Sequence, residues 1–358
     1  MSVTSPSIQS TPPFLENVPL KNFCTFGIGG PARYFFTVHN IHEMQQTIVW
    51  CRRNEIPYLV LGKGSNCLFD DEGFFGAVIL NKIDFMEQPF PGTFHTGAGY
   101  SFALLGVQTA RKGWGGLEFA SGIPASIGGA VYMNAGANGM ETCQTLASVD
   151  FVDEEGELKI ILRNDLTFSY RSSSFQKRGG AIVGATFNLT PQLDARKRQI
   201  EIVNKRKQTQ PYGAMSAGCV FLNPETTVQD NKVMKNFELQ SLPMRAEHSQ
   251  KVKEASIRSD CSSKDCVNLL SSTAVSRLNR VTSCVHAGAL IEQCGLKGLT
   301  VGGAQVSMVH ANFLINAGGA TCKDMQSLIT LVKQRVKEAT GIEMHSEVRY
   351  IPSQQDLP

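Results

Sequence analysis

Hydrophobic positions in the first half of the chain follow two patterns. Residues 33–38 and 58–61 are short runs of aromatic, aliphatic and β-branched side chains, which predict strands. Between them, residues 41–53 carry apolar side chains at helical spacing, and residues 102–110 repeat that spacing. Strand signals then return at close intervals over residues 147–189. Helices and strands mixed in this way indicate an α+β protein.

The second half contains the clearest helix of the chain. Residues 192–207 are highly charged and predict an exposed helix that acts as a hinge between two domains. Thr321 is a predicted N-cap, Asp324 completes a shortened capping box three residues later, and Gly341 is the predicted C-cap. A strand over residues 348–351 is expected to close the fold.

These patterns predict a division of the chain into two domains. We expect a disordered tail over residues 1–17, a first domain over 18–195 and a second domain over 196–358. Residues 225–285 interrupt the second domain, because they are rich in Ser and charged residues and lack a long apolar period. A long loop in a compact domain is either functional or disordered. This composition favours disorder or marginal helices.

Composition excludes several classes of function. The chain has 358 residues, of which 42% are hydrophobic, and a net charge of +3, which is too small to indicate a nucleic-acid partner. No apolar run approaches the roughly 18 residues of a membrane span. The Ser-, Thr- and Pro-rich N-terminus lacks the pattern of a signal peptide. Ten cysteines without a C-x-x-C pair favour free thiols in a reducing cytosol over a zinc site. We therefore expect a cytoplasmic protein without a metal, a membrane partner or a nucleic-acid partner.

A glycine-rich stretch over residues 113–141 organises the candidate chemistry. It holds eight glycines in 29 residues. Glycine permits positive φ angles and close approach of the backbone to a ligand, and a row of free N–H groups can bind a pyrophosphate. A surface loop is the simpler interpretation, but Ile123, Ile127, Val131 and Met133 are apolar side chains that a solvated loop does not need. A buried loop wrapped around a cofactor explains both features.

A second glycine turn lies upstream. The strand predicted over residues 58–61 runs directly into Gly62–Asn66, with the sequence Gly-Lys-Gly-Ser-Asn. This strand-to-turn order suits phosphate binding, but it is not G-x-G-x-x-G and no helical pattern follows. We therefore reject a Rossmann fold.

The order of these motifs resembles the UDP-N-acetylenolpyruvoylglucosamine reductase family over roughly residues 18–351. The motifs that carry the resemblance are residues 25–32, 61–66, 122–141, 170–173, 218–224, 289–298, 303–307, 310–313 and 347–349. Each motif is modestly specific alone, and the family order makes the set strong. Against the family, residues 225–285 then look like an insertion.

The resemblance implies a vanillyl-alcohol-oxidase-type (PCMH-type) FAD-binding domain followed by an α+β substrate-binding domain. It implies FAD as cofactor and NADPH as co-substrate, with FAD held without a covalent bond. The positions that match the family's FAD-binding segments are Leu61, Gly62, Lys63, Gly64, Ser65, Asn66, Gly122, Ile123, Pro124, Ser126, Ile127, Gly128, Gly129, Asn134, Ala135 and Gly136.

The family reaction reduces the enolpyruvyl double bond of a UDP-linked sugar in peptidoglycan precursor synthesis. NADPH reduces the flavin, hydride reaches C3 of the substrate, and C2 is then protonated. Arg171 matches the cation that faces the substrate carboxylate, since a guanidinium can clamp a carboxylate at two points. Glu347 matches the acid or hydrogen-bonding partner of that carboxylate, which requires a carboxyl with a raised pKa. A surface position is the alternative interpretation for each residue.

Cys219 departs from the family pattern. The family usually has Ser in Gly-Ser-x-Phe as the proton donor to C2, whereas this chain has Cys. A thiol has an unperturbed pKa of about 8.5 and can serve as a donor. It also introduces a group open to oxidation and alkylation. A buried, inert cysteine is the alternative.

The resemblance also implies residues that bind the UDP part of the substrate. The basic cluster Lys205, Arg206 and Lys207 and the amide of Asn223 are candidates for the diphosphate. The lysine usual before this Asn is Leu222 here, which puts one phosphate contact in doubt. Further family positions of the substrate site are Tyr170, Gln305 and His310.

Two other functions fit the same sequence. The chain could be another FAD oxidoreductase of this fold with a different substrate. It could also be a non-catalytic flavin or nucleotide-sugar binding protein, degenerate through Cys219 and the insertion. The presence of both Arg171 and Glu347 argues against the second alternative. The partner expected for the chain is the UDP-linked enolpyruvyl sugar, bound by a monomer.

Overall fold

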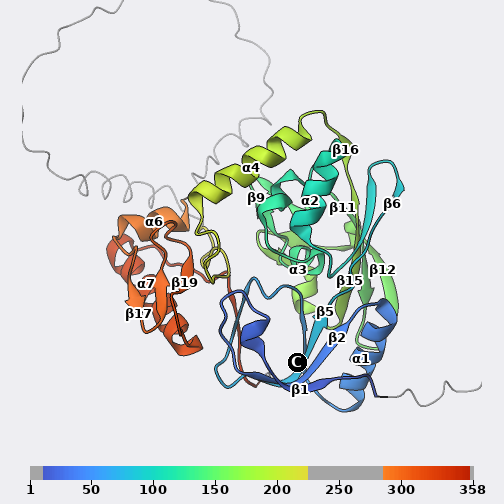
Figure 1. Cartoon of the computed structure of the whole chain (residues 1–358), viewed down its shortest axis with the longest axis horizontal. Coiled ribbons are helices and arrows are strands. Elements are labelled where there is room, and N and C mark those ends of the chain that lie inside the picture. Colours follow the sequence, from blue (N-terminus) through green and yellow to red (C-terminus); the bar gives the residue numbers. More distant parts are fainter. Residues whose placement is uncertain (1–10, 225–284, 355–358) are drawn as a thin grey trace, which may run out of the picture.

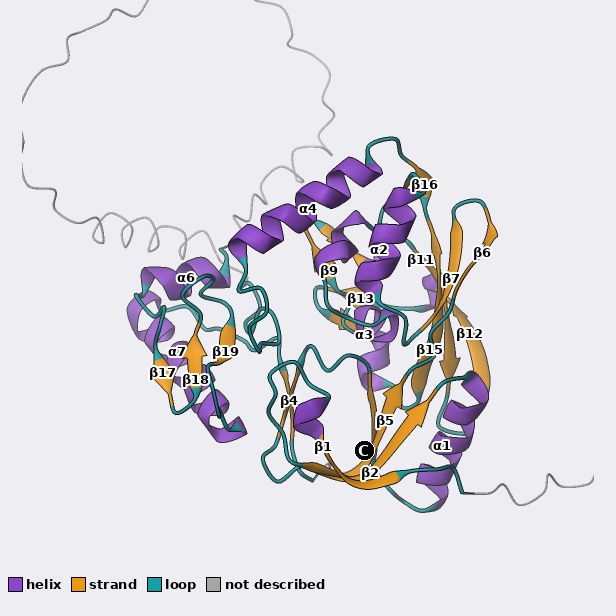
Figure 2. Cartoon of the chain, in the orientation of Figure 1, coloured by secondary structure: helices purple, strands orange, loops and turns teal. Residues whose placement is uncertain are grey.

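A computed structural model describes residues 11–224 and 285–354 (Figures 1 and 2). The predicted insertion and the first ten residues of the predicted tail therefore lie outside the described residues, apart from Val285. The helices are α1 Ile41–Arg53, α2 Phe102–Arg111, α3 Ile127–Tyr132, α4 Ala195–Thr209, α6 Ala287–Gln293 and α7 Cys322–Thr340. The strands are β1 Leu15–Pro19, β2 Pro31–Val38, β3 Tyr58–Leu61, β4 Cys67–Phe69, β5 Phe74–Asn81, β6 Met86–Phe90, β7 Thr93–Gly97, β8 Trp114–Gly115, β9 Gly136–Ala137, β10 Met140–Glu141, β11 Leu146–Val152, β12 Leu158–Leu162, β13 Phe168–Ser169, β14 Ser172–Ser173, β15 Ala181–Asn188, β16 Thr190–Pro191, β17 Thr300–Val301, β18 Ala304–Val306, β19 Leu314–Asn316 and β20 Arg349–Ile351. Short 3-10 helices are η1 Leu20–Asn22, η2 Glu118–Gly122, η3 Thr142–Gln144, η4 Arg163–Asp165 and η5 Ser174–Lys177.

The first sheet has the strand order β1-β2-β5-β3, with β2, β5 and β3 parallel. Alternate side chains of its strands serve two cores, because successive residues of a strand point to opposite faces. Phe36 and Ile79 pack with buried residues of α1 on one face, whereas Phe35 and Val78 join a second core on the other face. Asn40 begins α1, where its side chain accepts a hydrogen bond from the Glu43 N–H.

The second sheet has the order β12-β11-β15-β7-β6 and is antiparallel throughout. Its core includes Phe94, Phe102, Phe119 and Phe187, which lie on β7, α2, η2 and β15. Helix α4 packs along α2 and η2, so it lies on this part of the molecule (Figure 1).

The C-terminal unit combines the sheet β17-β18-β19 with helices α6 and α7 (Figure 2). Helix α7 confirms the predicted caps: Thr321 and Asp324 form a capping box, and Gly341 closes the helix with φ +74°. Its buried stripe includes Leu328, Val332 and Val336. None of the described helices is both long and apolar enough to cross a membrane.

The end of the chain returns to the first part of the molecule. Strand β20 pairs in parallel with β4, and the Phe75 N–H donates to the Ser353 carbonyl. The core around Phe69 and Leu80 is continuous with that of α7. Asp71 also accepts hydrogen bonds from the backbone N–H groups of Cys322 and Lys323 at the start of α7. The C-terminal unit is therefore docked on the first sheet by packing, strand pairing and a helix cap.

Three predictions require correction. Residues 15–17 do not belong to a disordered tail, because they form β1 and pair with β2. The stretch around Gly128 is not entirely a loop, because Ser126 caps the six-residue α3, whose Ile127, Ala130 and Val131 are buried at helical spacing. The charged helix predicted over residues 192–207 is α4, but it is not exposed on all sides, because one face packs against α2 and η2; its role as a hinge stays a prediction.

Candidate active site

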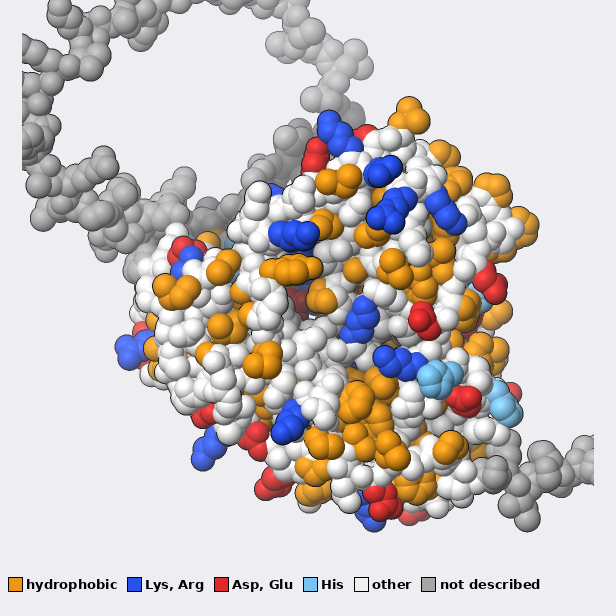
Figure 3. All heavy atoms as spheres, viewed as in Figure 1, with side chains coloured by type: hydrophobic (Ala, Val, Ile, Leu, Met, Phe, Trp, Pro, Cys, Tyr) orange, Lys and Arg blue, Asp and Glu red, His pale blue; other side chains and the backbone are white. Residues whose placement is uncertain are grey.

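A cavity of about 1290 Å³ lies between the two sheets and the C-terminal unit. Its walls contain the glycine turn after β3, the glycine-rich stretch around α3, the loop that follows α4, and Glu347. A single small ligand usually occupies roughly 300–1,000 Å³. The cavity can therefore hold a large cofactor beside a second ligand. Figure 3 shows Lys and Arg side chains distributed over the face that carries α2 and α4.

The two predicted glycine segments meet in the wall of this cavity. A side chain at Gly62 would overlap the Ser126 hydroxyl, and a side chain at Gly64 would overlap the Phe23 carbonyl. Gly64 also has φ +60°, which disfavours any residue with a side chain. Among the hydrogen bonds of loops, turns and side chains in the described chain, none is donated by the backbone N–H groups of residues 62–66. This turn is therefore a tight backbone cradle with free donors, which suits a pyrophosphate.

Most of the predicted cofactor residues line the cavity. All positions from Leu61 to Asn66 do so, and those of the second segment are Gly122, Ile123, Pro124, Ser126, Gly128, Gly129, Ala135 and Gly136. Ile127 and Asn134 lie outside this lining, and their contact with the cofactor stays a prediction. Ile127 is fully buried in the core of the second sheet. Asn134 is held by hydrogen bonds with Glu141, Ser169 and Cys143, so it shapes the loop.

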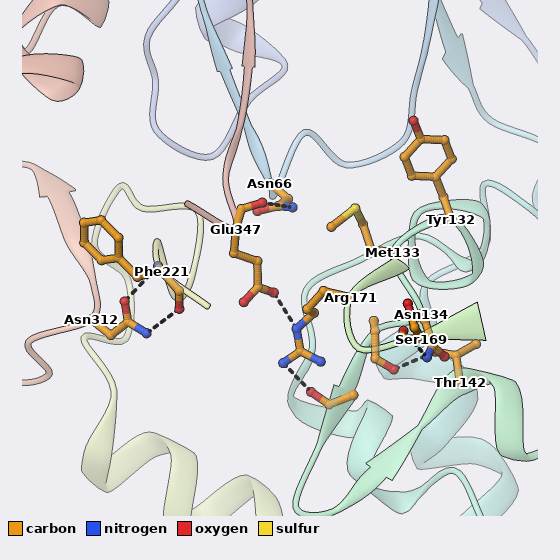
Figure 4. A network of polar contacts seen from close by, with 12 residues as sticks. Asn66, Tyr132, Met133, Asn134, Thr142, Ser169, Arg171, Phe221, Asn312 and Glu347 are labelled. Atoms are coloured by element: carbon orange, nitrogen blue, oxygen red, sulfur yellow. Dashed lines mark hydrogen bonds and ion pairs between the residues drawn. The ribbon is translucent and has the colours of Figure 1, made fainter. Parts of the chain in front are cut away.

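Arg171 and Glu347 line the cavity and form an ion pair with each other (Figure 4). Arg171 Nε lies 2.6 Å from Glu347 Oε1, although the two residues are 176 positions apart. The guanidinium also donates to the Gly136 carbonyl at 3.1 Å and lies over the ring of Tyr170 at 4.8 Å. Arg171 has a left-handed backbone with φ +55°, a conformation that costs energy in a non-glycine residue. The loop therefore holds this side chain in one direction.

Burial raises the pKa of the Glu347 carboxyl, and the charge of Arg171 opposes the shift without cancelling it. This is the direction expected for a carboxyl that can bind a proton near neutral pH. The backbone of Glu347 is fixed from two sides. Its carbonyl accepts from Asn66 Nδ2 at 3.1 Å, and its N–H donates to the Val220 carbonyl at 2.7 Å.

Cys219 lines the same cavity. Its backbone forms an isolated bridge to Phe313, and two residues later Phe221 forms another to Ser346, so the segment is held between two parts of the C-terminal unit. Asn312 secures it further, because its side chain exchanges two hydrogen bonds with the backbone of Phe221 (Figure 4). The segment is therefore held firmly near the ion pair.

Burial raises the pKa of the Cys219 thiol to about 11, with Glu347 adding to the rise and the charges of Arg206 and Arg171 opposing it. The thiol is therefore protonated at neutral pH, as a proton donor must be. The same shift opposes the expected reactivity of Cys219, because the thiolate is the form that alkylating agents and oxidants attack. Oxidation and alkylation of Cys219 stay predictions, and the raised pKa leads us to expect them to be slow at neutral pH.

Of the predicted basic cluster over residues 205–207, Arg206 lines the cavity. Lys205 and Lys207 are exposed and lie outside the lining, because successive residues of a helix point about 100° apart. A side chain at Gly122 would overlap the Arg206 stem. The guanidinium donates from Nε to Gln210 at 3.1 Å and has no ion pair with a described carboxylate. Burial lowers the pKa of Arg206, which reflects the cost of a charge without a counterion.

The remaining predicted substrate residues lie outside the cavity lining. Asn223 accepts a hydrogen bond from the Ala287 N–H at the start of α6. Gln305 donates to Thr300 in the β17–β18 hairpin, and His310 packs its ring against Phe313. Tyr170 stacks on the guanidinium of Arg171. These contacts support the local structure, and no substrate contact of these four residues follows from them.

Several cavity residues were missed from the sequence. Among the lining residues, these are Tyr58, Glu154, Arg178, Tyr212 and Arg349. Arg349 lies over the ring of Tyr132 at 4.8 Å. For Tyr58, the sequence indicated only that it begins a strand. A strand pattern does not show which face of the strand will line a cavity. Within residues 11–224 and 285–354, no group of three or more His, Cys, Asp or Glu could hold a metal ion.

Comparison with known proteins accounts for nearly the whole chain. Residues 32–161 match a family model described as FAD binding domain, and residues 210–351 match the model of the UDP-N-acetylenolpyruvoylglucosamine reductase C-terminal domain. A reductase of that name from Protochlamydia amoebophila is 50% identical, over 95% of this chain and 94% of the relative. Its counterpart from Chlamydia muridarum is 39% identical, over 96% of each chain. The crystal structure of the UDP-N-acetylenolpyruvylglucosamine reductase from Thermus caldophilus aligns with a TM-score of 0.67 and 31% identity, over 94% of this chain and 98% of that one.

Proposed function

Because this chain belongs to the UDP-N-acetylenolpyruvoylglucosamine reductase family, we propose that Arg171, Cys219 and Glu347 carry out the family reaction at the cavity described above. The chain is an FAD-dependent oxidoreductase with an FAD-binding domain and a C-terminal domain in an α+β fold. It uses NADPH to reduce UDP-N-acetyl-3-O-(1-carboxyvinyl)glucosamine to UDP-N-acetylmuramate in peptidoglycan precursor synthesis. Its product supports cell-wall biogenesis, and through it cell shape and division.

The residues of the cavity fit FAD. The turn over residues 62–66 offers free N–H groups to the pyrophosphate, and the overlap that any side chain at Gly62 or Gly64 would cause keeps the turn tight. When bound in this cavity, FAD would supply the hydride chemistry that links oxidation of NADPH to reduction of the enolpyruvyl group. Residues of this chain must then bind the substrate carboxylate, stabilise the charge that develops beside C2, and protonate C2.

Arg171 and Glu347 handle the carboxylate. The guanidinium of Arg171 is fixed by Glu347 and by the Gly136 carbonyl, which leaves part of its fork of donors for the substrate. Negative charge develops on the substrate carboxylate during the reaction. Hydrogen-bond donors that are already in position, in a site that excludes water, stabilise this charge most strongly. The raised pKa of Glu347 allows this carboxyl to share a proton with the substrate.

Cys219 donates the proton to C2. Its thiol is protonated at neutral pH, lines the same cavity, and lies within the electrostatic reach of both Arg171 and Glu347. Loss of the proton forms a thiolate, which the charges of Arg171 and Arg206 stabilise. The two arginines therefore assist the donor directly.

Arg206 anchors the diphosphate of the substrate. It is a half-buried cation without a described carboxylate partner, its stem lies against Gly122, and its charge acts on the Cys219 thiol. An anionic ligand offsets the cost of burying that charge. Arg171 is assigned to the substrate carboxylate and the glycine turn to the pyrophosphate of FAD, so we assign Arg206 to the diphosphate of the substrate. This assignment replaces Lys205 and Lys207.

The observation that carries the proposal is the convergence of a glycine cradle, the Arg171–Glu347 pair and a protonated Cys219 on one cavity. The test is NADPH oxidation by the purified yellow protein with and without the enolpyruvyl sugar. We expect oxidation matched by formation of UDP-N-acetylmuramate, and acid precipitation should release the flavin into the supernatant. A flavoprotein that oxidises NADPH equally without the sugar would be another FAD oxidoreductase. A protein that binds the sugar without turnover would be the non-catalytic alternative.

The location and assembly of the enzyme belong to the same proposal. Seven described cysteines are free thiols, which suits the reducing cytoplasm, where NADPH is available. All three catalytic candidates come from one chain, so a monomer is sufficient for the site. Light scattering of the purified protein tests the monomer, and fractionation of cells tests the location.

A further inference from the structure

Strand β12 forms one edge of the second sheet, and one of its faces is apolar and exposed. Leu158, Ile160 and Leu162 alternate along the strand, so their side chains share one face of the sheet. Their exposed fractions are 45%, 70% and 58%. The backbone of β12 pairs with β11 on one side, and no other described element pairs with its opposite side. Figure 2 shows β12 on the side of the molecule away from the C-terminal unit, and none of its residues lines the cavity.

The opposite edge of the same sheet has protection that β12 lacks. Edge strands of natural proteins usually carry proline, bulges or free charges that prevent pairing with another chain. Strand β6 contains Pro89 and a register irregularity between Glu87 and Phe90. Strand β12 has no proline and pairs regularly with β11, and the ammonium of its one charged residue, Lys159, is held by Asp153 of the same chain. The outer edge of β12 is therefore open to another strand.

The sequence of β12 is complementary to itself when two copies run antiparallel. A pairing centred on Ile160 sets this residue against its own copy, and Leu158 against Leu162 of the second copy. Lys159 then lies opposite Ile161, so no like charges oppose each other within the strand. The exposed aliphatic side chains of both copies form one continuous apolar stripe, and cross-strand pairs of this kind stabilise antiparallel strands.

The charges at the two ends of β12 match the same register. Glu157 precedes the strand and Arg163 follows it, so each Glu157 comes opposite Arg163 of the other copy. The Glu157 carboxylate makes no hydrogen bond or ion pair with the described residues. Nε and Nη1 of Arg163 donate to backbone carbonyls, which leaves Nη2 without a partner among the described residues. A shift of the pairing by two residues would instead set Glu157 against Asp165 or Ile161, so the charges favour the register centred on Ile160.

We propose that β12 pairs with β12 of a second copy of this chain, antiparallel and centred on Ile160, and so forms a two-fold dimer of complete enzymes. Two-fold symmetry is the arrangement in which one surface contacts itself. A single five-residue strand supplies less area than the roughly 1,200–2,000 Å² of stable interfaces, so the dimer is reversible. The monomer expected from the sequence is then the state of the dilute protein. The inference concerns assembly and does not depend on the proposed reaction.

Sedimentation velocity of the full chain with its flavin bound tests the dimer. We expect monomer near about 1 µM and a rise towards the dimer mass near about 100 µM, because small interfaces associate weakly. Ile160→Lys sets two ammonium groups against each other and should raise the dissociation constant of the dimer at least about tenfold. Phe90→Lys is the matched control, because Phe90 is also 70% exposed on an edge strand of this sheet. It should leave the dimer unchanged, and both variants should keep the wild-type turnover, since neither residue lines the cavity.

Cross-linking tests the register. Ile160→Cys brings two thiols opposite each other, where paired Cα atoms are about 4.5–5.5 Å apart and within the range of a disulfide. Oxidised glutathione should then give a covalent dimer on a non-reducing gel, above the background of the wild-type protein. Leu158→Cys is the matched control, because position 158 lies opposite position 162 and the two new thiols are roughly 13 Å apart. Its yield should stay at the background level.

The end charges give a further readout. Glu157→Arg opposes Arg163 of the second copy with a like charge and should raise the dissociation constant of the dimer roughly 3–10-fold. Glu338→Arg makes the same change of charge on α7 and should have no effect. The wild-type dimer should also weaken as salt rises, because exposed ion pairs are screened. Equal weakening by the two variants would mean that net charge, and not the pairing, controls association, and would overturn the assigned register.

The remaining outcomes also decide the proposal. Wild-type protein that stays monomeric over the whole range overturns it, and leaves β12 to a strand of another protein. A dimer that Ile160→Lys does not weaken, or that Phe90→Lys weakens equally, overturns it because the contact then lies elsewhere. Equal cross-linking at positions 158 and 160 overturns the pairing centred on Ile160. Should Ile160→Lys fail to fold, as shown by loss of bound flavin, the cross-linking of Ile160→Cys against Leu158→Cys decides.

Discussion

On the FAD-binding side of the cavity, the glycine turn over residues 62–66 presents backbone groups to the cavity. Gly62 lies against Ser126, Gly64 lies against Phe23, and the turn presents N–H groups. On the C-terminal side, single side chains face the cavity, and long-range contacts hold them. Cys219 lies on a segment fixed by Asn312, and Glu347 is held by Asn66 and Val220. The difference teaches that cofactor binding and turnover depend on separate parts of the structure, so mutations should separate them.

The largest effect is expected at Cys219. Cys219→Ala should lower kcat for the enolpyruvyl sugar by about 10²–10⁴-fold, because it removes a general acid. FAD content and NADPH oxidation by an artificial acceptor should remain. Cys219→Ser should restore much of the rate, since a hydroxyl serves elsewhere in the family. A wild-type rate in Cys219→Ala would mean that another group or water supplies the proton.

The opposite separation, loss of FAD binding or stability, is expected from a mutation in the glycine turn over residues 62–66. Gly64→Ala combines a left-handed backbone with overlap on the Phe23 carbonyl, and should cost about 2–4 kcal/mol in stability or in FAD binding. Gly113→Ala is the matched control, because Gly113 has φ +80° and no atom within 4 Å of its added side chain. It should cost only about 1 kcal/mol. Thermal denaturation and bound FAD per chain measure both variants, and equal losses would contradict the close contact at Gly64.

The raised pKa of Cys219 can be tested on the wild-type protein. With a pKa of about 11, little thiolate exists at neutral pH. Alkylation by iodoacetamide at pH 8 should therefore be about 100-fold slower than for an ordinary thiol, and should rise about tenfold per pH unit until about pH 11. Mass spectrometry of the peptide that contains Cys219 measures the rate. A plateau near pH 8.5 would show that the surrounding charges, and not burial, control the thiol.

The smallest effect is expected at α4. Arg206→Met keeps the stem over Gly122 and removes the charge, and should raise the KM for the substrate about tenfold with little change in kcat or FAD content. Lys207→Met removes an adjacent exposed charge and should have no comparable effect. Steady-state kinetics of the two variants decides between the residues. A larger effect at Lys207 would show that the exposed face of α4, and not Arg206, binds the diphosphate.

Local sequence patterns predicted the elements that local interactions build. The strand over residues 58–61 and the helix over 41–53 match β3 and α1, and Thr321, Asp324 and Gly341 cap α7 as expected. The order of strand and glycine turn also predicted a phosphate site at residues 62–66, which stays a prediction; the structure adds that Gly64 has φ +60° and no room for a side chain. The pattern failed within the glycine-rich stretch, where the six residues of α3 are too few to show a helical period.

By itself, the sequence determined which residues could do the chemistry: Arg171, Cys219 and Glu347 have side chains suited to a cation, an acid and a carboxyl. Only the tertiary structure decided that Arg171 pairs with Glu347 and that Arg206, not its neighbours, faces the cavity. Helix α4 is charged on several sides, so its sequence does not indicate which face packs. The pKa of Cys219 also depends on burial and on charges from distant parts of the chain. Such properties arise only when folding brings those segments together.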